Sequence, residues 1–373
     1  MILLAVLSFA IICTIVMVRR QLRFDARPIV ILGTGPMTLK LIEEVDSSND
    51  GCHLAGLVDY QRPTDDALRS IPWLGSFEHL SEIVDRVRPS RIIVALADRR
   101  GRLPLEALLE SRIKGVVVDD VLEFYEHLTG KIAIEELTPG TLILSKGFRH
   151  DGFGQAVARA MSLTIALAGL IVCAPILFLV ALAIKIDSRG PVFFVQERAG
   201  WNGKPFHLFK FRTMHPAGSA PPASEWVQDN VGRITRVGKW LRRFRLDEVP
   251  QLVNVLRGEM NLIGPRPHPT SNQKIFLEYI AYYGLRSTVR PGVTGWAQVR
   301  YGYANNLEQE TEKMRYDLYY IKNHTLWLDF KILFETVFIM LSGHGAAEVR
   351  RQVRREQAVK LRAALVTAQA VEQ

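Results

Sequence analysis

An uncharged block of 25 residues, Ala160 to Ile184, constrains the fold of this chain more than any other feature. A run of this length is enough to cross the hydrocarbon core of a bilayer as a helix. Pro175 lies near its middle, where proline kinks or breaks a helix, and basic residues flank both ends. Because the positive-inside rule disfavours an external basic flank, we expect a re-entrant membrane helix over about residues 156–184 that breaks at Pro175 and leaves by the same face. An ordinary membrane span is the alternative.

A second apolar segment covers residues 1–20. It carries no charge as far as Val18, and Arg19 and Arg20 follow. A cleaved signal peptide would begin with basic residues, so we expect an uncleaved membrane anchor with its arginines in the cytosol. A buried core helix is the alternative. At the other end, residues 346–373 form a charged tail with helical periodicity, whose role the sequence leaves open.

Residues 25–145 alternate apolar strands with helical stretches. Strands are expected at 28–33, 53–60, 91–96 and 115–120, with helices between them. This order is typical of a doubly wound parallel sheet, so we expect an α/β, Rossmann-like domain.

A glycine turn follows the first of these strands. Gly33 and Gly35 precede a helix, as in a nucleotide-binding fingerprint, and Asp59 ends the second strand where a ribose-binding acid would fall. Thr38 replaces the third glycine of that fingerprint. Gly33, Gly35 and Asp59 are therefore nucleotide-binding candidates. The alternative is that they only shape the turn and end the strand.

Residues 148–345 differ in character. Basic and aromatic residues interleave after Ile184, and turn signals at Gly190-Pro191 and Asn202-Gly203 indicate short hairpin-like pieces. Residues 214–228 are rich in Pro, Ala, Ser and Gly, which is typical of a loop. We expect a mostly helical α+β domain.

An acid pair, Asp247-Glu248, is the candidate chemical centre of this domain. We expect a helix to begin near Asp247, since Pro250 is tolerated in a first turn. The positive helix end and nearby arginines should keep Asp247 ionised, as a nucleophile toward phosphorus must be. Glu248 is turned about 100° away on a helix and suits a divalent metal. The alternative is that both are ordinary first-turn acids. Six basic residues precede the pair: Arg233, Arg236, Lys239, Arg242, Arg243 and Arg245.

Two arginine-proline turns follow. The sequence GPRP, Gly264 to Pro267, presents Arg266, and a second turn begins at Arg290. Arginine clamps phosphate with two parallel hydrogen bonds. Gly292 and Gly295 in the second turn permit close approach of the backbone to a ligand. The alternative is that both turns only support packing.

The net charge of +9 favours an anionic partner: nucleic acid, a membrane surface or a phosphorylated substrate. The basic residues lie beside apolar membrane segments, which favours lipid headgroups, and no nucleic-acid partner is expected. Only three cysteines occur, without metal-ligand spacing, so neither a disulfide framework nor a cysteine metal site is expected.

The second half of the chain resembles the bacterial sugar transferases, the monotopic polyprenyl-phosphate phosphoglycosyltransferases that start exopolysaccharide, capsule and O-antigen units. The front half is similar to that of long exopolysaccharide-type members, which carry a nucleotide-binding-like domain. Five motifs carry the resemblance, in the family's order: PVFFVQERAG, FKFRTM, LRRFRLDEVPQLVNVLRGEMNLIGPRP, RPGVTGWAQV and YDLYYIKNHTLWLDFKIL.

The resemblance implies transfer of a sugar-1-phosphate from a UDP-sugar to polyprenyl (undecaprenyl) phosphate. Asp247 would attack the phosphate attached to the sugar, UMP would leave, and polyprenyl phosphate would take the phosphosugar from the enzyme. Glu248 is associated with Mg2+. The turn of Pro265, Arg266 and Pro267 helps to hold phosphates, and Pro175 matches the family's helix break, although Ala174 precedes it here where serine is frequent. We also expect Lys210 and Arg212 of FKFRTM, together with Arg290, to bind substrate phosphate.

The same resemblance places the chain in the bacterial inner membrane, with its soluble domains on the cytoplasmic side. Membrane lipids are expected partners, and size favours a homodimer, although the sequence leaves the oligomeric state, the sugar and the glycan open. Two other functions remain alternatives. One is a nicotinamide-dependent sugar enzyme centred on the glycine turn, and the other is a membrane scaffold that does no chemistry.

Overall fold

The computed structural model describes residues 28–47, 53–96, 103–145, 147–148, 152–215, 233–302, 304 and 306–342. The expected anchor at 1–20 and the tail at 346–373 lie outside the described residues. The chain divides into two compact units, Met1–Ala133 and Ile134–Gln373. The boundary expected between the two soluble domains, at 145–148, lies a little beyond this division and stays a prediction.

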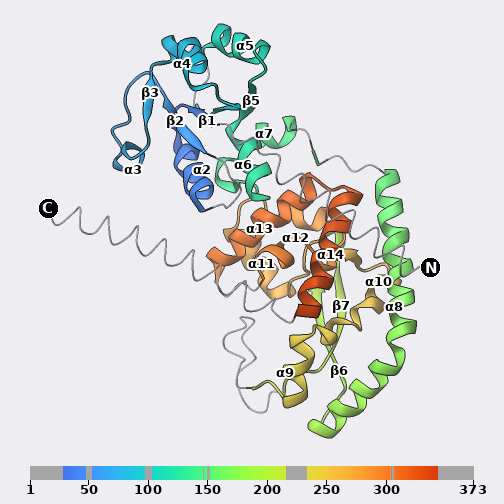
Figure 1. Cartoon of the computed structure of the whole chain (residues 1–373). Coiled ribbons are helices and arrows are strands. Elements are labelled where there is room, and N and C mark those ends of the chain that lie inside the picture. The colour runs from blue at the N-terminus through green and yellow to red at the C-terminus, as the bar shows by residue number, and fades with distance from the viewer. Residues whose placement is uncertain are drawn as a thin grey trace, which may run out of the picture. The chain divides into compact units, whose positions relative to one another are not determined.

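The first unit is built on a five-stranded parallel sheet with the strand order β3-β2-β1-β4-β5 (Figure 1). Its strands are β1 (Ile29–Leu32), β2 (Leu54–Val58), β3 (Trp73–Gly75), β4 (Arg91–Val94) and β5 (Val117–Asp120). The four predicted strands are confirmed, together with the α/β arrangement. The sequence analysis missed β3, because three residues that begin with an exposed tryptophan make no apolar run.

Alternate residues of the strands face opposite sides of the sheet, as the two-residue period of a strand requires. Ile29 and Ile31 of β1 pack in one cluster with α2 and α6, whereas Val30 and Leu32 pack in another with α4 and α5. Helices therefore cover both faces. The helices of this unit are α2 (Pro36–Ser47), α3 (Asp66–Arg69), the 3-10 turn η1 (Phe77–His79), α4 (Leu80–Val87), α5 (Leu105–Ile113) and α6 (Val121–Thr129).

The glycine turn after β1 has a clear structural role. Gly33 has φ +97, and a Cβ built on it would lie 2.9 Å from Leu96 Cδ2, so a side chain there would be strained. The carboxylate of Asp59 accepts hydrogen bonds from the Thr34 hydroxyl at 2.6 Å and the Tyr60 amide at 2.7 Å. These contacts fit the alternative in which the residues shape the turn and the strand end. Nucleotide binding by Gly33, Gly35 and Asp59 stays a prediction.

The second unit combines one long helix, seven further α-helices and two small sheets within the described residues. The strands β6 and β7 form an antiparallel hairpin around Asn202 and Gly203, as predicted, and β8 pairs with β9 in parallel. The elements are η2 (Ile134–Glu136), α7 (Pro139–Leu144), α8 (Gly152–Asp187), β6 (Phe193–Ala199), η3 (Trp201–Gly203), β7 (Pro205–Phe211), α9 (Arg236–Arg243), η5 (Leu246–Glu248), α10 (Gln251–Arg257), β8 (Asn261–Ile263), α11 (Thr270–Tyr279), η6 (Tyr283–Thr288), β9 (Gly292–Thr294), α12 (Trp296–Arg300), α13 (Leu307–Lys322) and α14 (Leu326–Ser342).

The apolar block folds as the 36-residue helix α8, which continues through Pro175. Figure 1 shows that α8 is bent rather than straight, as an interior proline leads one to expect. The proline therefore does not divide the chain into two separate helices. Re-entry into the membrane by one face stays a prediction.

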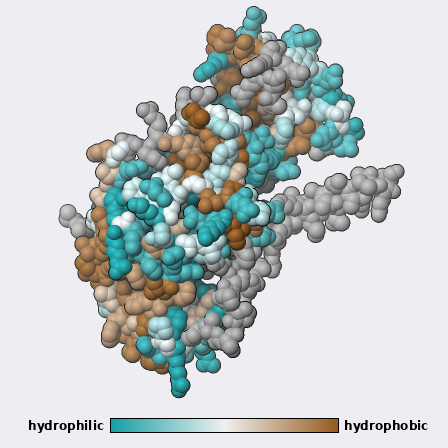
Figure 2. Space-filling view, turned by 180° about the vertical axis from the view of Figure 1, so that it is seen from behind, coloured by the Kyte–Doolittle hydropathy of each residue, from teal (hydrophilic) through white to brown (hydrophobic). Residues whose placement is uncertain are grey.

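Most of the side chains of α8 are exposed although they are apolar; Ile171, for example, is 67% exposed and Phe178 is 72% exposed. Figure 2 shows hydrophobic residues gathered at the lower left, the side on which α8 lies. Among the described residues, α8 is the one helix long and apolar enough to cross a membrane. A soluble core helix would be buried, so this surface favours contact with lipid.

Two arginines fasten α8 near its ends. The half-buried Arg159 donates to the carbonyl oxygens of Val255 and Met260, each at 2.7 Å. At the other end, the buried Arg212 donates to the carbonyl of Ser188 at 2.8 Å and that of Arg189 at 3.0 Å, so it holds the two residues that directly follow the helix.

Three glycines let the backbones of β8 and β9 approach each other. A Cβ built on Gly292 would lie 2.1 Å from the amide nitrogen of Gly264, and one on Gly295 would lie 2.2 Å from the Gly264 carbonyl oxygen. Any side chain at either position would collide with backbone. The expectation that Gly292 and Gly295 approach a ligand is therefore corrected: they approach Gly264.

Candidate active site

Asp247 and Glu248 lie in the short 3-10 turn η5. Arg245, in the left-handed region with φ 54, turns the chain out of α9 and into η5, and α10 begins only after Pro250. The expected helix start is thus a tight turn followed by a helix. Both acids are buried, with Asp247 9% exposed and Glu248 7% exposed. Buried acids require compensating partners, which makes their surroundings informative.

Glu248 is fully paired. Its two carboxylate oxygens accept from the two terminal nitrogens of Arg266, at 2.7 and 3.3 Å, and Arg245 lies 3.8 Å away. Burial by itself would raise the pKa of Glu248, but the guanidinium groups of Arg266 and Arg245 outweigh burial and hold that pKa at about 2. Glu248 is therefore ionised at every physiological pH.

Asp247 is in a different state. Within the described residues its carboxylate has no hydrogen bond and no ion pair. Burial, together with the negative charge of Glu248, raises the pKa of Asp247 to about 6, although Lys210, Arg242 and Arg266 act in the opposite direction. The sequence analysis considered only the groups that keep Asp247 ionised. The carboxylate is ionised at pH 7, but burial makes it more basic than an ordinary aspartate.

Lys210, on β7, is the third member of this site. It is partly buried, and its ammonium lies 4.8 Å from the centre of the Phe194 ring. Burial, together with the positive charges of Arg198 and Arg266, lowers the pKa of Lys210 to about 8. The negative charges of the two acids act in the opposite direction. Cations thus outnumber carboxylates around Asp247. Such a site suits a ligand with several negative charges.

Asn254 holds β7 beside the acid pair. It is fully buried on α10, donates to the His207 carbonyl at 2.7 Å and accepts from the Phe209 amide at 3.1 Å. These contacts fix the strand that carries Lys210 against the helix that follows Asp247. The sequence analysis did not single out Asn254, because nothing local in the sequence indicates a contact with a strand 45 residues away.

Arg212 and Arg290 have other contacts. Arg212 contacts the end of α8, as described above. The guanidinium of Arg290 stacks over the Trp201 ring at 4.1 Å, and its Nε donates to the Gly258 carbonyl at 3.3 Å. The structure therefore brings together Lys210, Arg266 and the two acids, whereas the contacts of Arg212 and Arg290 support the packing of the unit. Phosphate binding by Arg212 and Arg290 stays a prediction.

An apolar groove lies beside the turn that carries the acid pair. It has a volume of about 530 Å³ and lies between the second half of α8 and α9. Its lining includes Leu246, the neighbour of Asp247 in the chain, and Arg236 is its one charged lining residue. The groove is lined by Ile176, Leu179, Val180, Ala183, Arg236, Val237, Trp240, Leu241 and Leu246.

The donor set around Asp247 limits the kind of metal site that it can form. Among the described residues, no three His, Cys, Asp or Glu side chains gather to hold a metal ion. Mg2+ in phosphate chemistry needs only one or two carboxylates, because phosphate oxygens and water complete its shell. Asp247 and Glu248 meet that requirement, although Glu248 is paired with Arg266. The residues fit Mg2+ only as a site that a ligand's phosphates complete.

Comparison with known proteins identifies the family. A family model described as bacterial sugar transferase matches residues 153–343, which is more than half of the chain. This protein belongs to the bacterial sugar transferase family.

Several sugar transferases are similar to the chain over long stretches. The UDP-N-acetylgalactosamine-undecaprenyl-phosphate N-acetylgalactosaminephosphotransferase of Aeromonas hydrophila is 38% identical over 62% of this chain and 54% of its own length. The UDP-glucose:undecaprenyl-phosphate glucose-1-phosphate transferase of Escherichia coli K12 is 33% identical over 71% and 58%. The enzyme of that name in Xanthomonas campestris pv. campestris is 30% identical over 85% and 67%. The chain thus spans about half the length of the first two relatives.

Two arginine variants separate a contact that supports packing from one beside the acid pair. Arg212→Lys cannot serve all of the acceptors at the end of α8, so we expect it to lower the free energy of unfolding by about 1–3 kcal/mol and to leave binding of inorganic pyrophosphate, a simple polyanionic probe, unchanged. Arg266→Lys should weaken pyrophosphate binding by about tenfold with a smaller effect on stability. Thermal unfolding and calorimetric titration measure the two effects. If Arg212→Lys weakened pyrophosphate binding and left stability unchanged, Arg212 would be a phosphate ligand.

Proposed function

We propose that this protein transfers a sugar-1-phosphate from a UDP-sugar to polyprenyl phosphate, releasing UMP, and so starts the synthesis of an exopolysaccharide or a related surface glycan. The observation that carries the proposal is Asp247: a buried carboxylate with a raised pKa and no partner among the described residues, facing Lys210 and Arg266. Unpaired buried acids destabilise a fold, so they occur where chemistry requires them.

In the first half-reaction, a carboxylate oxygen of Asp247 attacks the phosphorus bonded to the sugar. The bond from that phosphorus to the oxygen bridging to UMP breaks, its electron pair leaves with UMP, and the phosphosugar stays on Asp247 as an acyl phosphate. Lys210 and Arg266 neutralise the negative charge that develops on the leaving group. Burial favours the attack, since it raises the basicity of the carboxylate and removes water from it.

Arg266 exchanges partners during this step. It is bound to Glu248 in the described structure, and a diphosphate offers it the same two-pronged geometry. If Arg266 turns to the diphosphate, the carboxylate of Glu248 is released from its ion pair and would be the group available to hold Mg2+. When bound there, Mg2+ would neutralise charge on the diphosphate oxygens.

In the second half-reaction, a phosphate oxygen of the polyprenyl phosphate attacks the same phosphorus, and the bond to Asp247 breaks. The carboxylate is regenerated, and the product is a polyprenyl diphosphate sugar. The apolar groove between α8 and α9 accommodates the isoprenoid chain, because its lining includes Leu246, the residue before Asp247, and exposed apolar residues of α8. The active site then lies at the cytoplasmic face of the inner membrane, where a lipid phosphate and a soluble nucleotide-sugar meet.

The test is to incubate the purified protein with Mg2+, undecaprenyl phosphate and a panel of UDP-sugars, and to measure which nucleotide is released. We expect UMP with at least one donor, and no UMP from Asp247→Asn, whose amide cannot attack phosphorus. Asp187→Asn, which makes the same substitution where an amide oxygen can still accept from the Val237 amide, is the matched control and should keep its release of UMP. Release of UDP instead would mean an ordinary glycosyl transfer and would exclude this mechanism.

The pH dependence follows from two groups. Asp247 must be ionised to attack, so kcat/KM for the UDP-sugar should rise as the pH passes through about 6. Lys210 must be charged, so kcat/KM should fall above about pH 8. In Lys210→Arg the alkaline limb should disappear, because a guanidinium keeps its proton, and the acid limb should remain. An alkaline limb that persists in this variant would assign it to another group.

The groove can be filled without touching the acids. We expect Ala183→Phe to raise KM for polyprenyl phosphate about tenfold, which corresponds to roughly 1.4 kcal/mol of lost apolar contact, and to leave the initial release of UMP intact. Ile186→Phe, on the same helix but 78% exposed and outside the groove lining, is the matched control. Equal effects of the two variants would place the lipid elsewhere.

A further inference from the structure

The turn that carries Arg266 is held from several sides at once. The Pro265 carbonyl accepts from the amide of Gly292, and the His268 carbonyl accepts from the amide of Ala199, each at 2.9 Å. Backbone from two distant strands therefore fixes the two ends of the turn. The proline residues at 265 and 267 stiffen it further, since each has a fixed φ.

Two arginine side chains hold the middle of the same turn. Arg286 donates to the carbonyl of Arg266 at 2.9 Å, and Arg198 donates to the carbonyl of Pro267 at 3.0 Å. Each of the four consecutive carbonyls from Pro265 to His268 thus accepts a hydrogen bond. These four contacts restrain the backbone that carries the side chain of Arg266.

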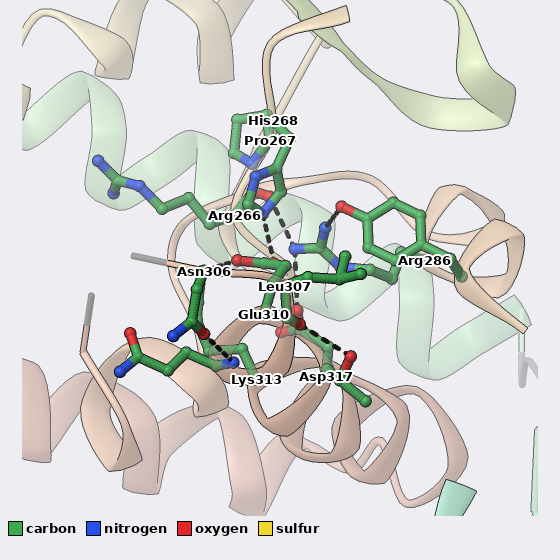
Figure 3. A network of polar contacts seen from close by, with 12 residues as sticks. Arg266, Pro267, His268, Arg286, Asn306, Leu307, Glu310, Lys313 and Asp317 are labelled. Atoms are coloured by element: carbon green, nitrogen blue, oxygen red, sulfur yellow. Dashed lines mark hydrogen bonds and ion pairs between the residues drawn. The ribbon is translucent and has the colours of Figure 1, made fainter. Parts of the chain in front are cut away.

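Arg286 is itself held by a buried framework, which consists of Tyr283, Asp317, Glu310, Lys313 and His268. It is 8% exposed, pairs with Asp317 at 2.8 Å, and donates to the hydroxyl of Tyr283 (Figure 3). Its guanidinium therefore serves the Arg266 carbonyl, a carboxylate and a hydroxyl together. Lysine has no fixed fork of donors and cannot reproduce this arrangement.

The helix α13 supplies the anions of the framework from one face, because Glu310, Lys313 and Asp317 are three and four residues apart. Glu310 lies 3.1 Å from Lys313 and 3.0 Å from Nε2 of His268. Burial lowers the pKa of His268 to about 3, so the ring beside Glu310 is neutral. The charged groups that remain are two cations, Arg286 and Lys313, and two anions, Glu310 and Asp317, so their charges balance. Balanced buried charges of this kind specify geometry more than they add stability.

The framework and the acid pair lie on opposite sides of the turn. Figure 3 shows the Arg266 side chain extending away from Arg286 and Glu310. Its guanidinium reaches Glu248, as the distances of 2.7 and 3.3 Å show. The framework thus contacts the backbone of Arg266, whereas the side chain of Arg266 contacts the acid pair.

We propose that Arg286, held by Asp317 on α13, is a positioning residue that sets where Arg266 meets Glu248 and the donor diphosphate. The inference rests on the proposed function, because it assigns Arg266 to the phosphates. Errors of about 1 Å in the placement of a catalytic group reduce rates by large factors, so a rigid backbone under Arg266 has a direct kinetic consequence.

A double-mutant cycle tests this. Arg286→Lys should lower kcat/KM for the UDP-sugar about tenfold in the otherwise unchanged protein, mainly through KM, and less than about twofold when residue 266 is already lysine. Arg315→Lys is the control: Arg315 is on α13, the helix that carries Asp317, pairs with Glu135 and Glu312, and should change kcat/KM less than about twofold. Equal losses from Arg286→Lys in both backgrounds, or no loss in a folded variant, would overturn the proposal. If Arg286→Lys does not fold, Tyr283→Phe removes one contact of Arg286 and must show the same non-additivity.

A second readout does not depend on activity. Hydrogen exchange of the peptide that covers residues 264–270 should be faster in Arg286→Lys than in the unchanged protein and unaffected by Arg315→Lys. Unchanged exchange in Arg286→Lys would contradict the positioning role. Failure of the unchanged protein to release UMP with any donor would count against the proposed function instead, and exchange would still decide whether Arg286 holds the turn.

Discussion

The ion pair between Glu248 and Arg266 is the interaction on which the rest of the site depends. Two adjacent carboxylates are buried in one short turn, and both cannot be ionised there without compensation. Arg266 satisfies both oxygens of Glu248, which leaves Asp247 as the acid without a partner among the described residues. The pair also joins η5 to the turn between β8 and α11. The same contact thereby sets the geometry of the site and the chemical difference between its two acids.

A second constraint is the position of this polar site beside an apolar surface. The exposed side chains of α8 border the groove whose lining includes Leu246. Arginines fasten this helix to the unit near both of its ends, so the charged site and the apolar groove lie next to each other in the same unit. That arrangement suits a reaction in which one substrate is a soluble polyanion and the other is an anionic lipid.

Sequence reasoning succeeded where the signal was local. The apolar runs at 28–33, 53–60, 91–96 and 115–120 became strands, and the turn at Asn202-Gly203 became a hairpin. The family motifs also mark the acid pair and Arg266 separately, and the structure shows that Arg266 contacts Glu248. The strand β3 was missed, since three residues carry too little pattern.

What the sequence could not show concerns contacts between residues far apart in the chain. Phosphate binding by Arg212 of FKFRTM stays a prediction, and only the folded structure shows that Arg212 contacts the end of α8. Gly292 and Gly295 approach another backbone rather than a ligand. The raised pKa of Asp247 comes from burial, which no local pattern reports. The spacing of Glu310, Lys313 and Asp317 on α13 was a readable signal, yet it does not reveal which turn those residues support.

The central claim is that Asp247 carries the phosphosugar during transfer. The most direct measurement is mass spectrometry of the protein incubated with a UDP-sugar donor and Mg2+ in the absence of polyprenyl phosphate, rapidly quenched and digested. The account predicts that the mass of one sugar phosphate is added to the peptide containing Asp247, and that it disappears when polyprenyl phosphate is supplied. An unmodified peptide under conditions in which the complete reaction releases UMP would contradict it, because transfer would then be direct and Asp247 would have another role.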